Sequence, residues 1–207
     1  MIPEGPVNDG LLERYLADGV PVRLLYEPTD VCAVLGASRT AEKDLILPAL
    51  QADRLPVRSR RGGGGTVILS PGQAVLALVT EVDSPFSNRE YAARINGWIA
   101  EALARLGVPD AVPEGISDLA VDGRKILGTS IYRSRRILFY QASLLVSCDL
   151  SLFGRYLAFP DRVPDYRAGR GHEDFCTTLA REGHALTVPA VLSALEVTVD
   201  RELPRFR

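Results

Sequence analysis

The run of four glycines at positions 62–65 limits the possible folds of this chain more than any other feature of its sequence. The segments on either side, Pro56-Val57 and Thr66-Val67-Ile68-Leu69, are both typical of strands. Glycines allow positive φ values and let a ligand come close to the backbone amides. The preceding Arg58-Ser59-Arg60-Arg61 adds positive charge and forked donors. An anion-binding loop is therefore favoured, with a flexible linker as the alternative.

The first 82 residues predict short helices and strands. Asn8 can cap a helix whose apolar residues recur at helical spacing, namely Leu11, Leu12, Tyr15 and Leu16. Two strands separated by a turn are predicted over residues 21–27 and 31–35. Thr40 can cap a further helix, which Pro48 is expected to distort. Residues 73–82 are apolar enough to form a central strand.

The rest of the chain begins with a break at Ser84-Pro85. The longest predicted helix follows over residues 88–106, with an apolar stripe of Tyr91, Ile95, Trp98, Ile99, Ala102, Leu103 and Leu106. Strands are predicted over residues 117–121, 124–132 and 137–147, the first two joined by the hairpin turn Asp122-Gly123. Helices are predicted over residues 149–157, 172–181 and 189–203, with a loop over 159–171.

Consecutive strands that are joined by short turns favour antiparallel pairing. The predicted fold class is therefore α+β, a mixed and largely antiparallel sheet flanked by helices. The chain has no internal repeat and no segment long enough to separate domains, so one domain is expected over residues 1–207.

The charge and the cysteines argue against several classes of protein. A formal net charge of −2 gives no basic field for nucleic acid. Cys32, Cys148 and Cys176 are odd in number and far apart, which argues against a disulfide framework or a cysteine-based zinc site. Without a signal peptide, or an apolar run near the roughly 18 residues that a membrane span requires, a cytoplasmic protein is expected.

A second pattern surrounds the predicted hairpin. Asp118 begins one strand and Lys125 lies on the next, so the hairpin can bring both side chains to one end of the sheet. Lys125 and Lys43 are the only lysines among 24 basic residues. Gly128 indicates that another group comes close to the second strand. The alternative is a surface hairpin with a solvated lysine.

Together, the two patterns resemble the lipoate–protein ligase family, within the biotin/lipoate ligase and transferase superfamily. Its motif Arg-x-x-Gly-Gly-Gly-(Ala/Thr)-Val is matched over residues 60–67. Its Asn-Asp and Gly-x-Lys-x-x-Gly motifs are matched over residues 117–130, with Ser117 in place of the asparagine. Tyr140-Gln141-Ala142 replaces the family's His-His-Gly. The resemblance covers roughly residues 10–185 and implies the catalytic domain alone, without the C-terminal accessory domain of many members.

By this resemblance, ATP or the acyl-adenylate would contact residues of both motifs, namely Arg60, Gly63, Gly64, Gly65, Thr66, Val67, Ile68, Asp118 and Lys125. Lys125 would be the catalytic residue, beside the acyl carboxyl group and the α-phosphate. Lys125 and Gly128 would contact lipoate, and Asp118 would support this site or bind Mg²⁺.

The implied activity is that of an ATP-dependent lipoate–protein ligase. Lipoate or octanoate would be activated to acyl-AMP and transferred to a lysine of a lipoyl carrier protein. ATP with Mg²⁺ and lipoate would be substrates, and no tightly bound cofactor is expected. Because no accessory domain is expected, either weak activation or a separately encoded small accessory protein is predicted. Neither nucleic acid nor a membrane is an expected partner.

Two other functions remain open. One is an octanoyl or lipoyl transferase that moves the acyl group between carriers, in some members through a cysteine nucleophile. Cys148 and Cys176 are more typical of buried structural thiols, and His172 and His184 lie outside both motifs. The other is a non-catalytic homologue that binds lipoate or a carrier, which the missing histidines suggest.

Overall fold

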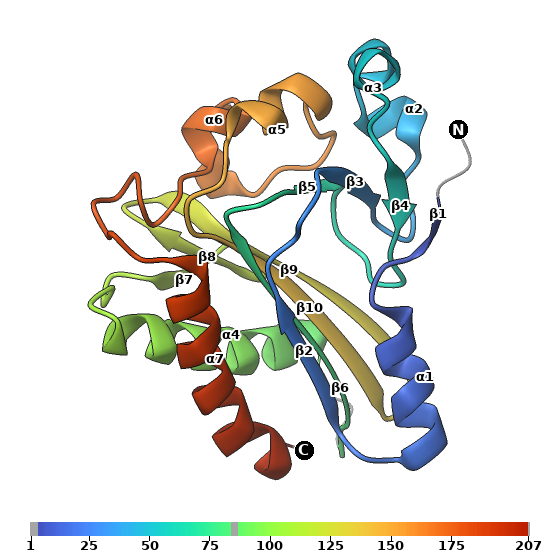
Figure 1. The fold of residues 1–207 in the computed structure, drawn as a ribbon, viewed down its shortest axis with the longest axis vertical. Coiled ribbons are helices and arrows are strands. Elements are labelled where there is room, and N and C mark those ends of the chain that lie inside the picture. The colour runs from blue at the N-terminus through green and yellow to red at the C-terminus, as the bar shows by residue number, and fades with distance from the viewer. Residues whose placement is uncertain (1–3, 84–86, 207) are drawn as a thin grey trace.

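The computed structural model describes residues 4–83 and 87–206, and it contains two β-sheets with helices packed around them (Figure 1). The larger sheet has the strand order β2-β6-β10-β9-β8-β7 and is antiparallel throughout. Its strands are β2 (Val22–Tyr26), β6 (Gln73–Glu81), β7 (Val112–Glu114), β8 (Asp118–Val121), β9 (Arg124–Ser134) and β10 (Ile137–Leu145). The predicted α+β class with a largely antiparallel sheet is confirmed.

The smaller sheet has the order β1-β4-β3-β5, with two parallel pairings and one antiparallel pairing. Its strands are β1 (Glu4–Pro6), β3 (Cys32–Leu35), β4 (Val57–Ser59) and β5 (Val67–Leu69). These strands, together with α5 (Ser151–Tyr156) and α6 (His172–Phe175), enclose a second core that includes Ile68 and Phe153.

The main core lies on one face of the larger sheet, under α4 (Asn88–Arg105) and α7 (Val188–Glu202). In the predicted apolar stripe, Tyr91, Ile95, Ile99, Ala102 and Leu103 are buried. Ser87 and Glu90 form a reciprocal capping box at the start of α4. The opposite face of the sheet is covered by α1 (Asp9–Asp18), which packs Leu11, Leu12 and Tyr15 on Ala77, Val79 and Phe139.

The hairpin that carries the second motif has the predicted turn. Asp122 and Gly123 both have positive φ, at 49° and 65°. Two consecutive positive φ values are the signature of a type I′ turn, whose twist matches that of paired strands. The turn therefore sets the register that brings Asp118 on β8 and Lys125 on β9 to the same end of the sheet.

The two strands predicted over residues 21–27 and 31–35 are present as β2 and β3, and they lie in different sheets. Other local predictions were wrong. Pro48 does not distort a helix; it occupies the first turn of α3 (Leu47–Asp53), which follows the separate α2 (Ala41–Asp44). Asn8 and Thr40 stand at helix starts without a side-chain capping bond. The break at Ser84-Pro85 lies outside the described residues.

The predicted helix over residues 172–181 was also too long. Helix α6 ends at Phe175, because Cys176 forms a parallel bridge with Lys125 of β9, and the Thr177 amide donates to the Lys125 carbonyl oxygen at 2.9 Å.

The remaining described elements are the short 3₁₀ turns η1 (Asp165–Arg167) and η2 (Leu203–Arg205). Over the described ranges, every helix is too short or too polar to span a bilayer.

Candidate active site

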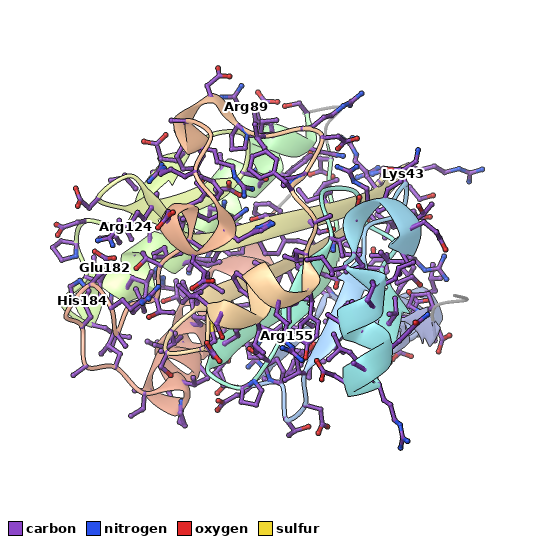
Figure 2. The ribbon with its side chains drawn as sticks, turned by 90° about the horizontal axis from the view of Figure 1, so that it is seen from above. Lys43, Arg89, Arg124, Arg155, Glu182 and His184 are labelled. Atoms are coloured by element: carbon purple, nitrogen blue, oxygen red, sulfur yellow. The ribbon has the colours of Figure 1, made fainter. Side chains whose placement is uncertain are left out.

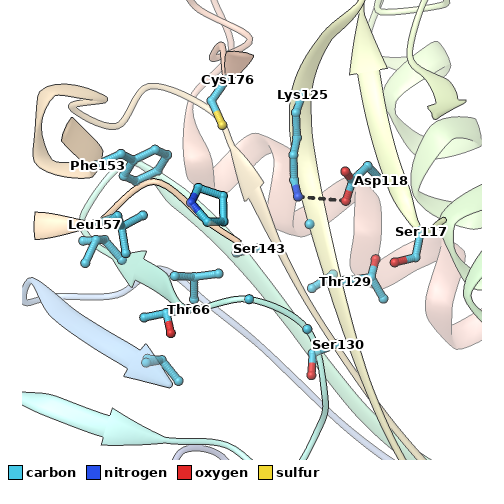
Figure 3. A pocket seen from close by; sticks show the side chains of 18 of the residues that line it. Thr66, Ser117, Asp118, Lys125, Thr129, Ser130, Ser143, Phe153, Leu157 and Cys176 are labelled. Atoms are coloured by element: carbon cyan, nitrogen blue, oxygen red, sulfur yellow. Dashed lines mark ion pairs between the residues drawn. The ribbon is translucent and has the colours of Figure 1, made fainter. Parts of the chain in front are cut away.

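A cavity of about 410 Å³ lies where the two sheets meet, and residues of both sequence motifs line it (Figure 3). Apolar side chains form one part of its wall, among them Val67, Leu69, Val75, Phe153 and Leu157. Polar and charged groups form another part, among them Asp118, Lys125, Thr129 and Ser130. The cavity therefore suits a molecule that has an apolar chain at one end and a charged group at the other.

Lys125 and Asp118 form an ion pair inside this cavity. The Lys125 Nζ lies 2.8 Å from Asp118 Oδ1, and the two side chains are 26% and 13% exposed. The second carboxylate oxygen, Oδ2, accepts a hydrogen bond from the Tyr166 hydroxyl at 2.8 Å. Lys125 is therefore not the solvated lysine of a surface hairpin, and Asp118 has both oxygens engaged.

A β-bulge explains how Lys125 and Gly128 face the same cavity although they are three residues apart. The pairing of β8 with β9 shifts between Leu119, which opposes Leu127, and Ala120, which opposes Lys125. The extra residue in β9 interrupts the alternation of faces. A Cβ atom on Gly128 would lie 3.0 Å from both Cε and Nζ of Lys125. The group that comes close to Gly128 is therefore the side chain of Lys125 itself.

Arg60 lies beneath the glycine segment, with its guanidinium buried. It donates to the carbonyl oxygens of Val34 at 3.3 Å and Gly63 at 3.0 Å, and to Ser130 Oγ at 2.9 Å. Burial lowers the pKa of Arg60 to about 10, so the group is still a cation at neutral pH. These contacts make Arg60 a support of the loop. Arg60 also lines the cavity, and its contact with the nucleotide stays a prediction.

The glycine segment is held in place at Gly62 and Gly64 and by the hydrogen bonds of Arg60, so the linker alternative is wrong. A Cβ on Gly62 would lie 2.0 Å from Ser130 Oγ, and one on Gly36 would lie 2.3 Å from the Gly64 carbonyl oxygen. Gly64 itself has a φ of 96°. Ser130 Oγ also donates to the Gly63 carbonyl oxygen at 3.0 Å. The close contact at Gly62 and the positive φ at Gly64 therefore require glycine, whereas a Cβ on Gly63 or Gly65 would meet nothing within 4 Å.

Most of the residues predicted for the site do line the cavity. They are Arg60, Gly64, Gly65, Thr66, Val67, Ile68, Asp118, Lys125 and Gly128. Gly63 is not among them; its carbonyl oxygen is bound by Arg60 and Ser130.

The residues that depart from the family's motifs have defined positions. The hydroxyl of the buried Tyr140 donates to Asn96 Oδ1 at 2.6 Å, on the face of the larger sheet that α4 covers. Gln141 and Ala142 line the cavity. Asn96 also donates to the Ser117 carbonyl oxygen at 3.0 Å and accepts from Thr129 at 3.2 Å. The Asn96 amide thereby connects α4 with β9 and with the residue that precedes β8.

Sequence reasoning missed Asn96, Tyr166 and Asp44. Asn96 is a polar residue within a helix whose stripe is apolar, and this signal could have drawn attention to it. Asp44 accepts from the Thr66 hydroxyl and lies 3.5 Å from Arg39 Nε. Tyr166 belongs to the Pro/Gly/Arg loop, and no local pattern shows that it reaches Asp118.

The thiols and histidines have different surroundings. Cys148 is buried and lies outside the cavity lining, and its burial raises the pKa of the thiol to about 12. Cys176 lines the cavity, with its sulfur turned toward it (Figure 3). Burial raises the pKa of Cys176, and the charge of Lys125 opposes this effect. His172 also lines the cavity; burial lowers its pKa, and its Nε2 lies 3.1 Å from the Ala158 carbonyl oxygen.

Replacement of Tyr166 by phenylalanine is expected to weaken any reaction that depends on Lys125. Burial and the charge of Asp118 raise the pKa of Tyr166, so the hydroxyl stays protonated and donates at neutral pH. Loss of this bond, typically about 0.5–1.5 kcal/mol, should lower kcat by about 2–10-fold. The rate of the adenylate formation that the resemblance implies, at saturating substrate, measures this change, with circular dichroism as the folding control. An unchanged kcat would show that Tyr166 does not position the pair.

Known proteins resemble this chain in sequence. The family described as the lipoyl protein ligase A/B catalytic domain matches residues 7–199. A putative lipoate-protein ligase A from Saccharomyces cerevisiae is 26% identical over 160 residues, which cover 73% of this chain and 38% of that protein. Lipoate-protein ligase A from Psychrobacter cryohalolentis is 28% identical over 124 residues, covering 60% and 35%. The chain thus matches little more than a third of the length of these relatives.

Solved structures agree with the fold. A bi-partite lipoate protein ligase from Thermoplasma acidophilum superposes with a TM-score of 0.74 at 22% identity, covering 90% of this chain and 73% of that chain. A lipoate-protein ligase A bound with ATP gives a TM-score of 0.73 at 20% identity, covering 90% and 74%. The family match over most of the chain and the shared fold lead to one conclusion. The chain belongs to the lipoyl protein ligase A/B catalytic domain family.

Proposed function

We propose that this protein is an ATP-dependent lipoate–protein ligase. The main support for this proposal is the cavity, whose lining combines an apolar wall with the Lys125–Asp118 ion pair and the glycine loop. A molecule with an apolar acyl chain and a carboxylate group matches this cavity, because one part of the wall is apolar and another part is charged. Solved neighbours of the same fold are described with bound ATP and with bound lipoic acid.

In the first step, a carboxylate oxygen of lipoate would attack the α-phosphorus of ATP, and the bond to the bridging oxygen would break. Lipoyl-AMP and pyrophosphate result. Lys125 is a compact cation beside the oxygens that gain negative charge, so it would stabilise this transition state. Asp118, held by Tyr166, would orient the ammonium group. In the second step, the amine of a carrier lysine would attack the acyl carbon and release AMP.

Asp118 fits the role of a partner for Lys125 better than that of a magnesium ligand. Its oxygens are engaged by Lys125 and Tyr166. Among the described residues there is no group of three or more histidine, cysteine, aspartate or glutamate side chains able to hold a metal ion. We therefore propose that Mg²⁺ enters as part of the ATP substrate, bound to its phosphates.

Mass spectrometry of a lipoyl carrier domain tests this function. After incubation with the protein, ATP, Mg²⁺ and lipoate, the carrier should gain the mass of one lipoyl group on a lysine. Omission of ATP should abolish the gain. A gain that requires an acylated donor protein and no ATP would instead assign the protein as a transferase.

The transferase is the second candidate, because Cys176 lies beside Lys125. The backbones of the two residues form a bridge, and the thiol lines the same cavity. A transferase would use this thiol to form an acyl thioester. The raised pKa of Cys176 weighs against a thiolate and favours the ligase.

Replacement of all three cysteines, Cys32, Cys148 and Cys176, by alanine should therefore leave adenylate formation within about threefold of the wild-type rate, because no thiol takes part in that step. The exchange of labelled pyrophosphate into ATP measures the rate. A mass shift on Cys176 that hydroxylamine removes would reveal an acyl thioester and overturn the ligase mechanism.

The carrier and the accessory partner are also part of the proposal. The Thermoplasma acidophilum neighbour is described as a bi-partite ligase together with its E2 lipoyl domain. By analogy, we propose that this chain modifies a lipoyl carrier domain and works with a separately encoded small protein. The isolated chain is then expected to form lipoyl-AMP weakly and to lipoylate the carrier poorly. Full turnover of both steps by the isolated, monodisperse chain would show that no partner is needed.

A further inference from the structure

A second cavity, of about 480 Å³, adjoins the first one and shares part of its lining, including two residues of the glycine loop. Gly64, Gly65, Arg39 and Arg162 line both cavities. Lys43, the other lysine of this arginine-rich chain, lines only the second. The first cavity has a largely apolar wall, whereas the wall of the second is built mainly from charged and hydroxyl-bearing side chains.

The positive charges of this second cavity are only partly compensated. Arg39 is held between two carboxylates, with its Nε 3.5 Å from Asp44 and its Nη1 2.8 Å from Asp161. Lys43 and Arg162 are exposed, and in the described part of the chain neither side chain forms an ion pair. Within the described ranges, two exposed cations without an ion-pair partner and one cation held by carboxylates thus line one polar space, as suits a ligand with several negative charges.

The position of this cavity connects it to the proposed reaction. A Cβ on Gly64 would lie 3.8 Å from the carbonyl oxygen of Thr129, which directly follows Gly128 and its contact with Lys125. A nucleotide whose α-phosphate lies at Lys125 can therefore direct its remaining phosphates across Gly64 and Gly65. The apolar part of the first cavity offers those phosphates no charge.

We propose that the second cavity binds the pyrophosphate portion of ATP, with Lys43 and Arg162 contacting its β- and γ-phosphate oxygens. This inference rests on the proposed ligase function. When the carboxylate oxygen bonds to the α-phosphorus, the electron pair of the broken P–O bond leaves with pyrophosphate. The added negative charge on the leaving group falls among Arg39, Lys43 and Arg162, which stabilise it.

Titration calorimetry with inorganic pyrophosphate tests the site without any need for catalysis. The double variant Lys43→Gln/Arg162→Gln should bind pyrophosphate about tenfold or more weakly than the wild type, because two charge-assisted contacts are lost. Both side chains are exposed, so folding should survive. Arg89→Gln is the matched control, since Arg89 is an exposed cation on α4 and lies apart from Lys43 (Figure 2). It should bind pyrophosphate as the wild type does.

Equal affinity of the wild type and the double variant, or no binding by the wild type, would overturn this assignment. Lipoate-dependent pyrophosphate exchange separates its failure from that of the ligase function. The double variant should show a raised KM for pyrophosphate with an unchanged KM for lipoate. If the wild type and the double variant both catalyse exchange with the same KM for pyrophosphate, the second cavity is not the pyrophosphate site, and the ligase function still stands. Pyrophosphate binding that depends on Lys43 and Arg162, without any exchange, would reject the ligase function and leave the cavity as a polyphosphate site.

Discussion

Replacement of Lys125 by alanine is expected to slow lipoyl-adenylate formation by about 10²–10³-fold, the effect of about 3–4 kcal/mol that a single preorganised electrostatic group contributes. Lys125 lines the same cavity as the apolar wall and the glycine loop, and its ammonium group lies 2.8 Å from Asp118 Oδ1. Its loss leaves the charge that develops at the carboxylate and the α-phosphate without this partner.

Lys125→Arg distinguishes a general need for charge from a need for this geometry. The space beside Lys125 exists because Gly128 has no Cβ, and a planar guanidinium does not match a site shaped for an ammonium group. We expect the arginine variant to lose most of the activity as well. Circular dichroism should show both variants folded. Near wild-type exchange by a folded Lys125→Ala protein would remove Lys125 from the site.

Replacement of Arg60 by alanine should reduce stability and activity together. The buried guanidinium donates to Val34, Gly63 and Ser130, so its removal takes these hydrogen bonds from the loop and leaves an unfilled space beneath it. We expect a loss of about 2–4 kcal/mol in the free energy of unfolding. Urea unfolding measures this loss, and pyrophosphate exchange should fall in the same protein.

Arg61→Ala is the matched control for this change. Arg61 is adjacent in sequence but exposed, and its ion pair with Asp9 joins the loop to α1 at the surface. Surface pairs of this kind contribute about 0–1 kcal/mol, so this variant should remain nearly as stable as the wild type. If Arg60→Ala lost activity while keeping full stability, a direct contact with the nucleotide would explain Arg60 better than support of the loop.

The sequence predicted those parts of the fold whose signals are local. Helix α4 follows from its apolar stripe, β6 from its apolar run, and the motif hairpin from Asp122-Gly123. The smaller sheet was not predicted as a separate unit, because most of its strands are only three residues long. Its parallel pairs join segments that are distant in the chain, and no local pattern encodes such pairing.

The candidate site was predicted as a set of residues, and the structure shows how they are arranged. The two motifs do meet in one cavity. The burial of Arg60 could not be predicted, because a basic run next to glycines is usually exposed. The contact of Tyr166 with Asp118 spans 48 residues of sequence. The end of α6 at Phe175 depends on a bridge to a strand 51 residues earlier, which helix propensity does not reflect.

Lipoate-dependent exchange of labelled pyrophosphate into ATP tests the central claim most directly, because it requires the reversible formation of lipoyl-AMP and no carrier. With Mg²⁺ and lipoate, the wild-type protein should incorporate label into ATP, and omission of lipoate should reduce incorporation to background. The rate should fall in Lys125→Ala and persist when all three cysteines are replaced. Carrier lipoylation by a protein that shows no exchange under any of these conditions, with or without its accessory partner, would contradict the ligase assignment.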